Sequence, residues 1–313
     1  MNDCILASLV LLMAIILDWF YPRHEGLAYL LHPVHLTYSI SQSLFSRMQH
    51  TRIMGVLIWF MSVVPVMVIY IAPLLVIGRS WIFILVSAIV LKMTFSLRLL
   101  IDTARNYLNN KEQEALSYAQ QLVRRNVYVL DEEHVNSAVI ESLAESLVDG
   151  FSSPLFYFSL LGVPGALLQR LANTMDSSLG YRDEPYREPG WFSAKVDTLI
   201  NYIPARLTAL IILFTAMLLG EKPSINIFKR NRRLTQSINA GYPMAAVSAS
   251  LGIRLEKINS YSIGSGKLPS RADVENTIRL ITASAIIMII LSMITQCIAS
   301  LIITTIIHNW VLF

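Results

Sequence analysis

Charged residues are scarce in this chain. Of its 313 residues only 15% are charged, whereas 54% are hydrophobic, and the mean hydropathy is +0.54. An average soluble domain carries about 25% charged residues. The composition therefore excludes an ordinary soluble domain and predicts a membrane protein.

Cysteine and the common nucleotide-binding motifs are also scarce. Cys4 and Cys297 are the two cysteines, and both lie inside apolar runs, where a thiol behaves as a small hydrophobic group and says nothing about the redox compartment. The "GSGK" before Leu268 resembles a phosphate loop, but Tyr261 stands where the motif needs Gly and Leu268 where it needs Ser or Thr. A nucleotide would have to be held by another arrangement.

Long apolar runs fill much of the rest. Five of them, which begin at Cys4, Ile53, Trp81, Thr208 and Ile281, approach or exceed the roughly 20 residues that cross a bilayer. The first lacks the basic start and the small-residue cleavage site of a signal peptide, so we expect it to remain as a helix. The runs predict an all-α, polytopic integral membrane protein with about five membrane segments.

Two further apolar stretches contain helix-breaking residues. The run that starts at Pro154 is interrupted by "GVPG", and Pro204 interrupts "LINYIPARLTALIILF". Proline removes a backbone donor, and irregular backbone at membrane depth is tolerated only beside protein or water. We therefore expect some segments to be broken or re-entrant.

The excess positive charge indicates a side of the membrane rather than a nucleic-acid partner. The formal net charge is +4, and basic residues concentrate in "EKPSINIFKRNRRLTQS" after Gly220, which suits a cytoplasmic loop. Phe228 is the single aromatic residue in the basic run, and no nucleic-acid-binding motif accompanies it. We expect a multi-pass protein of the cell membrane, with the lipid bilayer and no nucleic acid as its partner.

Three polar segments separate the apolar runs. Residues 102–153, 169–197 and 221–279 are too short or too polar to be independent domains, so we predict one membrane domain, 1–313, whose helical polar loops build one site. The first of these segments has helical periodicity, and Gly150 is expected to end its second helix.

Three carboxylates share one predicted helix face. Glu141, Glu145 and Asp149 are spaced four residues apart, which aligns their side chains. Such oxygen ligands suit a magnesium ion shared with substrate phosphates. The alternative is a solvated acidic stripe, but the position just before "GFSSP" and a membrane segment favours a site.

The most charged stretch is "NTMDSSLGYRDEPYREPGW". It adds Asp176, Asp183, Arg182 and Arg187, and the two guanidinium groups suit phosphate or carboxylate ligands. A charge at the bilayer centre costs about 2.5–3.5 kcal/mol, so this loop must be wet, paired or filled by a ligand. The alternative interpretation is a turn whose charges neutralise one another.

Arg206 and the histidines His32 and His35 are the other polar candidates. Arg206, with Asp197 and Asn201 one to two turns before it, favours a polar helix face over a side chain that merely reaches the interface. His32 and His35 are three residues apart with no third ligand nearby, so they are interpreted as interfacial histidines rather than a metal site.

Several stretches together resemble one family, the CobD or CbiB proteins of cobalamin biosynthesis, which are membrane adenosylcobinamide-phosphate synthases. The resemblance covers "LLHPVHL", then the block from "ESLAESLVDG" to "NYIPARLTAL", then "NAGYPMAAVSASLGIRLEK" and "YSIG". It implies that a corrinoid carboxylate, adenosylcobyric acid, is joined to an aminopropanol phosphate or related amino alcohol. It also implies ATP and Mg²⁺, with cobalt only inside the corrinoid, and other enzymes of the cobalamin pathway as partners.

The predicted site combines positions that the resemblance covers with Asp149, Asp183 and Arg187, which the spacing and charge of the polar segments indicate; the individual roles are our inference. The catalytic set is Glu141, Glu145, Asp176 and Arg182, and the metal set is Glu141, Glu145, Asp149 and Asp176. The substrate-binding set is Asn173, Tyr181, Asp183, Tyr186, Arg187, Trp191, Asp197, Arg206 and Asn239. Amide formation needs an activated carboxylate, plausibly an acyl phosphate, and the charge of its transition state suits magnesium and arginine.

Two alternatives stay open. One is a magnesium-dependent membrane prenyltransferase of the UbiA type, which "NTMD" loosely resembles, although such enzymes need two acid-rich motifs of tighter spacing. The other is a non-catalytic transporter or regulator, because broken helices and buried charge also mark transport pathways.

Overall fold

The computed structural model describes residues 3–78 and 80–311, which form two compact units. Unit 1 takes the described residues up to Ser96, then Ser153–Ile200 and those from Ile289 on, and unit 2 takes Leu97–Ser152 and Asn201–Met288. Each unit is thus assembled from separated stretches of chain. The single membrane domain stays a prediction.

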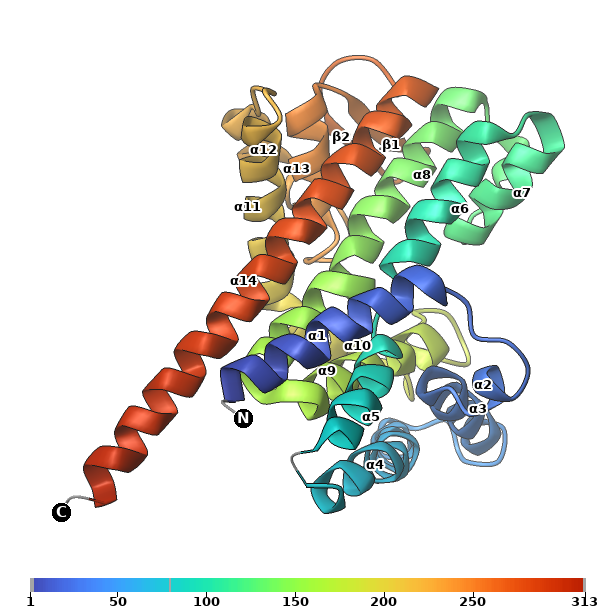
Figure 1. Ribbon diagram of the computed structural model, residues 1–313. Coiled ribbons are helices and arrows are strands. Elements are labelled where there is room, and N and C mark those ends of the chain that lie inside the picture. Colours follow the sequence, from blue (N-terminus) through green and yellow to red (C-terminus); the bar gives the residue numbers. More distant parts are fainter. Residues whose placement is uncertain (1–2, 79, 312–313) are drawn as a thin grey trace. The chain divides into compact units, whose positions relative to one another are not determined.

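The described residues of unit 1 form helices joined by loops and include no strand (Figure 1). Its helices α1 and α5 pack together, and α3, α4 and α10 pack against α9. The bounds are α1 (Asp3–Phe20), α2 (Gly26–Leu30), α3 (Pro33–Phe45), α4 (Arg52–Val76), α5 (Trp81–Lys92), α9 (Ser153–Leu179) and α10 (Trp191–Ile200), with the later part of α14 (Arg271–Val311).

Helix α4 has the surface of a membrane helix. Thr51 caps its start by accepting a hydrogen bond from the Met54 amide at 3.4 Å. One face buries Ile58, Val63 and Val66, whereas large apolar side chains on the rest of the helix are exposed. An apolar patch of this size is stable in lipid rather than in water.

Helix α9 is broken where the sequence predicted. Gly162 has φ 66° and ψ −157°, inside the helix and two residues before Pro164. Glycine adopts a positive φ at little cost, and proline cannot donate to the preceding turn. The "GVPG" break therefore follows from local chemistry.

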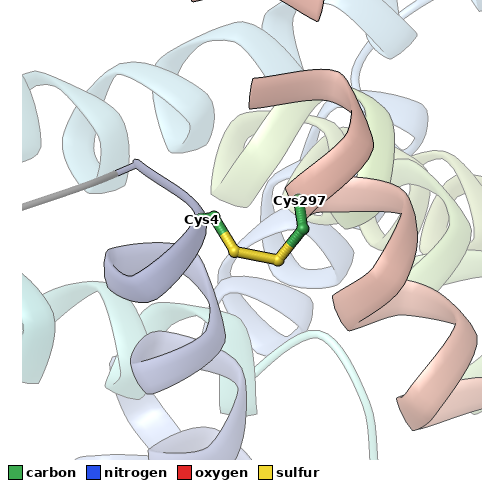
Figure 2. The surroundings of a disulfide bond; sticks show 2 residues. All are labelled: Cys4 and Cys297. Atoms are coloured by element: carbon green, nitrogen blue, oxygen red, sulfur yellow. A yellow bond between two sulfur atoms is a disulfide. The ribbon is translucent and has the colours of Figure 1, made fainter. Parts of the chain in front are cut away.

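A disulfide bond joins the two cysteines, as Figure 2 shows. Cys4 lies in the first turn of α1 and Cys297 lies in α14, both in unit 1, and their Cα atoms are 4.5 Å apart. The two sulfur atoms therefore crosslink the first and last helices. This corrects the interpretation of the cysteines as thiols that act only as small hydrophobic groups.

Unit 2 contains the polar segments. Its bounds are α6 (Leu97–Asn109), α7 (Glu112–Leu122), η1 (Val127–Val129), α8 (Glu132–Leu147), η2 (Val148–Ser152), α11 (Tyr202–Leu218), α12 (Ile225–Asn231), α13 (Gly241–Leu251), β1 (Arg254–Lys257) and β2 (Tyr261–Gly264), with the first part of α14. Its core is built on α8 and α13, and every residue from Gly241 to Ser250 is buried. The small side chains of α13 allow this close packing.

Two local features of unit 2 differ from expectation. Strands β1 and β2 form an antiparallel hairpin in which Leu255 pairs with Ile263, and the periodicity did not reveal it because each strand has only four residues. Gly150 does not end a helix, which corrects the prediction. It lies in the π-helical turn η2, which connects α8 directly to α9.

Several helices are long and apolar enough to cross a membrane, which agrees with the prediction of a polytopic membrane protein. Within the described residues, Arg52–Val76, Glu132–Leu179 and Arg271–Ala299 are long and apolar enough. The count rises to five if the bent pairs α5 with α6 (41°) and α10 with α11 (43°) are each one span. The second bend lies at Asn201, close to the predicted break at Pro204, whereas the first apolar run forms a shorter helix.

Candidate functional site

The predicted site residues belong to both units, and each set is described by itself. Unit 2 holds Glu141 and Glu145 on α8, Asp149 in η2, Arg206 on α11 and Asn239 just before α13. Unit 1 holds the others, in the last turns of α9, the segment 180–190 and α10: Asn173, Asp176, Tyr181, Arg182, Asp183, Tyr186, Arg187, Trp191 and Asp197.

Glu141 is the centre of a buried hydrogen-bond network in unit 2. Its side chain accepts hydrogen bonds from Ser137 Oγ at 2.7 Å, from the Tyr261 hydroxyl at 2.7 Å and from Arg125 Nη2 at 3.1 Å to each oxygen. Burial and the neighbouring Glu141 carboxylate raise the pKa of Tyr261, so its hydroxyl stays a donor. The network connects α8 to β2 and to the segment after α7.

This arrangement is a poor fit to a magnesium site made of three carboxylates. Both oxygens of Glu141 already accept hydrogen bonds. Among the described residues, no group of three or more His, Cys, Asp or Glu side chains is placed to hold a metal ion. Magnesium is often bound by one or two carboxylates with substrate phosphates, so Glu145 and Asp149 stay candidates of that simpler kind.

Arg206 is held rigidly in unit 2. Its Nη1 donates to the Tyr202 carbonyl at 2.5 Å and to Asn239 Oδ1 at 3.1 Å. Its Cζ lies 3.3 Å from the Tyr202 ring centroid and 4.3 Å from that of Tyr242. The guanidinium thus lies close to two aromatic rings, and its hydrogen bond brings Arg206 and Asn239 together. The polar helix face expected for Arg206 with Asp197 and Asn201 stays a prediction.

In unit 1, the second half of the segment 180–190 packs firmly on α3 and α4. Arg52 Nε pairs with Glu188 at 2.8 Å, and the Tyr186 ring stacks on Phe45 with centroids 4.6 Å apart. A Cβ atom added at Gly55 would lie 2.0 Å from the Pro189 carbonyl oxygen, so helix and loop are in direct backbone contact. Arg52 also lies 5.5 Å from the Trp191 ring.

The first half of the same segment is exposed. Every residue from Tyr181 to Pro185 is accessible, and so is Arg187. In the described part of the chain, Arg182, Asp183 and Arg187 form no ion pair with each other or with another residue. The charges do not neutralise one another, which argues against the alternative of a self-neutralising turn.

The two glycines of this segment fill a different role from the one their flexibility suggests. A Cβ atom at Gly180 would lie 1.9 Å from Asp176 Oδ1, and one at Gly190 would lie 1.9 Å from the Leu179 carbonyl oxygen. Both positions require glycine because the chain passes too close for a side chain. The end of α9 and the loop are consequently packed as one structure.

Asn173 and Asp197 are brought together across two helices. Asn173 Nδ2, on α9, donates to Asp197 Oδ1, on α10, at 3.1 Å. Asp176 lies one turn after Asn173 and is half-buried, whereas Trp191 begins α10 and is exposed. The predicted residues of unit 1 therefore line one region, from the end of α9 to α10.

Comparison with known proteins identifies the family. The sequence profile of the CobD/Cbib protein family matches residues 11–293. The chain belongs to the CobD/Cbib family. A protein of Aeropyrum pernix named "Probable cobalamin biosynthesis protein CobD" is 41% identical over 265 residues, 82% of each chain. Proteins of the same name from Methanothermobacter thermautotrophicus and Thermoplasma acidophilum are each 35% identical, over 82% and 80% of this chain and 86% and 85% of theirs. No solved structure matches the chain.

Sequence reasoning missed several residues of this CobD/Cbib protein that fix the predicted ones in place. Arg125 and Tyr261 are the partners of Glu141, and Arg52 is the partner of Glu188. Arg52 is separated from Glu188 by 136 residues, and no local pattern signals such a contact. The unusual polarity of Arg52 at the start of an apolar run was the available signal.

Proposed function

We propose that this chain is a cobalamin-biosynthetic enzyme, an adenosylcobinamide-phosphate synthase. It joins the carboxylate of adenosylcobyric acid to the amine of an aminopropanol phosphate, or a related amino alcohol phosphate, and releases adenosylcobinamide phosphate. The observation that carries this proposal is the family match over residues 11–293, which includes every proposed site residue. The relatives are named for cobalamin biosynthesis.

The reaction requires an activated carboxylate. ATP transfers its terminal phosphoryl group to the corrinoid carboxylate, which leaves ADP and an acyl phosphate. The amine then attacks the acyl carbon, the new C–N bond forms, and inorganic phosphate leaves with the electron pair of the broken C–O bond. The amine loses a proton in this step, so a nearby carboxylate is useful as an acceptor.

The residues divide into three proposed roles. Arg182 and Arg187 are exposed and outside any ion pair in the described chain, which suits binding of anionic substrate groups. Asp176, beside the Asn173–Asp197 hydrogen bond, is proposed as the catalytic carboxylate. Tyr181, Tyr186 and Trp191 offer aromatic surface for the corrinoid, and Asp183 extends the polar rim.

Magnesium is proposed to arrive with ATP and to be held mainly by phosphate oxygens. Glu145 and Asp149 are the carboxylates that suit it, and the hydrogen bonds of Glu141 assign that residue to positioning α8. Cobalt enters only as part of the corrinoid. We place the enzyme in the cell membrane, where other enzymes of the cobalamin pathway are proposed partners.

One assay tests the proposal. Purified protein in detergent is incubated with adenosylcobyric acid, aminopropanol phosphate, ATP and Mg²⁺, and the corrinoid products are separated by chromatography. Formation of the amide with release of ADP is expected. A transporter or a prenyltransferase would leave adenosylcobyric acid unchanged, so absence of product beside an active family member would overturn the proposal.

A further inference from the structure

Three arginines surround one tyrosine in unit 2. Tyr242 begins α13, and the Cζ atoms of Arg206 and Arg232 lie 4.3 and 5.6 Å from its ring centroid. Arg233 is exposed, and its charge also acts on the Tyr242 hydroxyl. Arg206 belongs to α11, whereas Arg232 and Arg233 directly follow the end of α12 at Asn231, so the fold gathers the guanidinium groups from separate parts of the chain.

No acidic side chain balances these charges. Within residues 3–78 and 80–311, none of the three arginines forms an ion pair with Asp or Glu. Arg232 Nε is buried and has no hydrogen-bond acceptor. A buried charged donor without an acceptor is destabilising, and like charges held together add to this cost. A bound anion would therefore stabilise this cluster of positive charges.

Hydrogen bonds hold Arg206 in place before any ligand binds. The Nη1 hydrogens of Arg206 are used by the Tyr202 carbonyl and Asn239, which leaves the Nε and Nη2 donors without an acceptor among the described residues. A Cβ atom at Gly241 would lie 2.6 Å from the Arg232 carbonyl oxygen, so α13 packs directly on the backbone of that arginine. Preorganised donors lose little entropy on binding.

We propose that Arg206, Arg232 and Arg233, with Tyr242 and Asn239, form a phosphate-binding subsite. Three positive charges exceed what a single carboxylate neutralises, and they match the two or more negative charges of a phosphomonoester or a polyphosphate. Planar guanidinium groups also bind phosphate oxygens in pairs. The subsite adds a binding site for phosphate to the synthase proposed above. Only the identity of the phosphate compound that occupies it rests on that proposed function.

The titration of Tyr242 agrees with this assignment. Burial raises the pKa of its hydroxyl, but the neighbouring guanidinium groups of Arg233, Arg206 and Arg232 outweigh burial and place the pKa below its usual value. The same positive potential that stabilises a phenolate stabilises a bound phosphate.

Calorimetric titration of the purified full-length protein tests the subsite. Inorganic pyrophosphate, inorganic phosphate and ATP are the probes, and nanodiscs containing phosphatidylglycerol test a lipid headgroup as the source. Replacement of both Arg232→Ala and Arg233→Ala should weaken binding of the preferred soluble probe at least tenfold. Arg230→Ala, an exposed arginine on the same helix, is the matched control and should bind as the wild type does.

The outcomes separate the subsite from the proposed reaction. Equal affinity of wild type and double variant for every soluble phosphate overturns the subsite, even if the amide assay succeeds. Loss of pyrophosphate binding in the double variant supports it, even if no amide forms. Arg232→Lys keeps the positive charge and is the control for misfolding. The subsite is supported if this variant binds pyrophosphate more tightly than the double variant does and has the melting temperature of the wild type. If the double variant loses binding only to phosphatidylglycerol nanodiscs, the cluster binds a lipid headgroup. That result would overturn the proposal that a soluble phosphate compound binds there.

Discussion

Glu141 is expected to stabilise the fold of unit 2. Glu141 is 5% exposed and accepts hydrogen bonds from three side chains of unit 2. Glu141→Ala leaves Arg125 without its partner, and loss of one member of a buried pair costs about 3 kcal/mol. The free energy of unfolding in detergent, from denaturant titration, should fall by about that amount. An unchanged unfolding curve would contradict the structural role.

Glu145, one turn later on the same helix, is expected to behave differently. Glu145→Gln should sharply lower magnesium-dependent amide formation and leave the melting temperature unchanged, because a half-buried carboxylate is replaced by a group of the same shape. The measurement is activity across a magnesium titration, with Glu141→Gln as the comparison. Wild-type activity at every magnesium concentration would return Glu145 to the role of a solvated acid.

The histidines between α1 and α3 predict a pH dependence. The rings of His24 and His32 are 4.6 Å apart, and Lys92 Nζ lies 2.9 Å from His24 Nε2. Burial, followed by the nearby positive charges, lowers the pKa of His24 to about 4 and that of His32 to about 3. Between these values and the ordinary 6.5 the unfolded chain binds protons that the folded chain does not. Stability is therefore complete above pH 6.5 and is lost as the pH falls toward 4.

Thermal unfolding between pH 7.5 and 4.5 measures this loss. His32→Asn removes one titrating ring and keeps a residue that can cap α3, as His32 does by accepting from the Val34 amide. The melting temperature of the variant should fall less with acidification than that of the wild type. Parallel curves for the two proteins would rule out His32 as a source of the pH dependence.

At the scale of elements, the sequence predicted what local chemistry decides. Glycine and proline in the sequence predicted the helix breaks near Gly162 and Pro204, and the length of the apolar runs predicted α4 and α14. The hairpin β1–β2 and the turn η2 depend on packing with distant residues, so no pattern revealed them. For the same reason the loop charges were identified, but Arg52, their partner from another helix, was not.

The packing of the segment 180–190 leads to a test of its attachment. Arg52→Ala removes the ion pair with Glu188, which contributes up to about 1 kcal/mol because both side chains are partly exposed. Cleavage by chymotrypsin after Tyr181 or Tyr186 should become up to about fivefold faster. Arg47→Ala, an exposed neighbour without such a partner in the described chain, should not change the rate. Equal cleavage of all three proteins would mean that the ion pair does not restrain the loop.

At the scale of the whole molecule, composition was sufficient to predict a helical membrane protein, because lipid leaves few ways to satisfy the backbone. The covalent link between the first and last helices was beyond the same reasoning. Cys4 and Cys297 are 293 residues apart, and two cysteines in apolar runs give no sign of their distance in space.

The disulfide predicts a thiol count. In denaturant without reductant, no thiol should react with a maleimide reagent, and two should react after reduction. Cys297→Ser should expose one reactive thiol and lower stability by about 2–5 kcal/mol, the usual effect of losing a native disulfide. Reactive thiols in the unreduced, denatured wild type would show that the bond does not form.

The same bond makes almost the entire polypeptide a closed ring, with a sequence separation of 293 between the joined residues. One proteolytic cut in a loop between the two cysteines gives two fragments that the disulfide still joins, so they migrate as a single molecule. Only a reductant, or a second cut, separates them. A preparation in which every molecule is cleaved once would therefore run as the full-length protein on a non-reducing gel. Cleavage of the loop between α9 and α10 would be visible only after reduction of the disulfide.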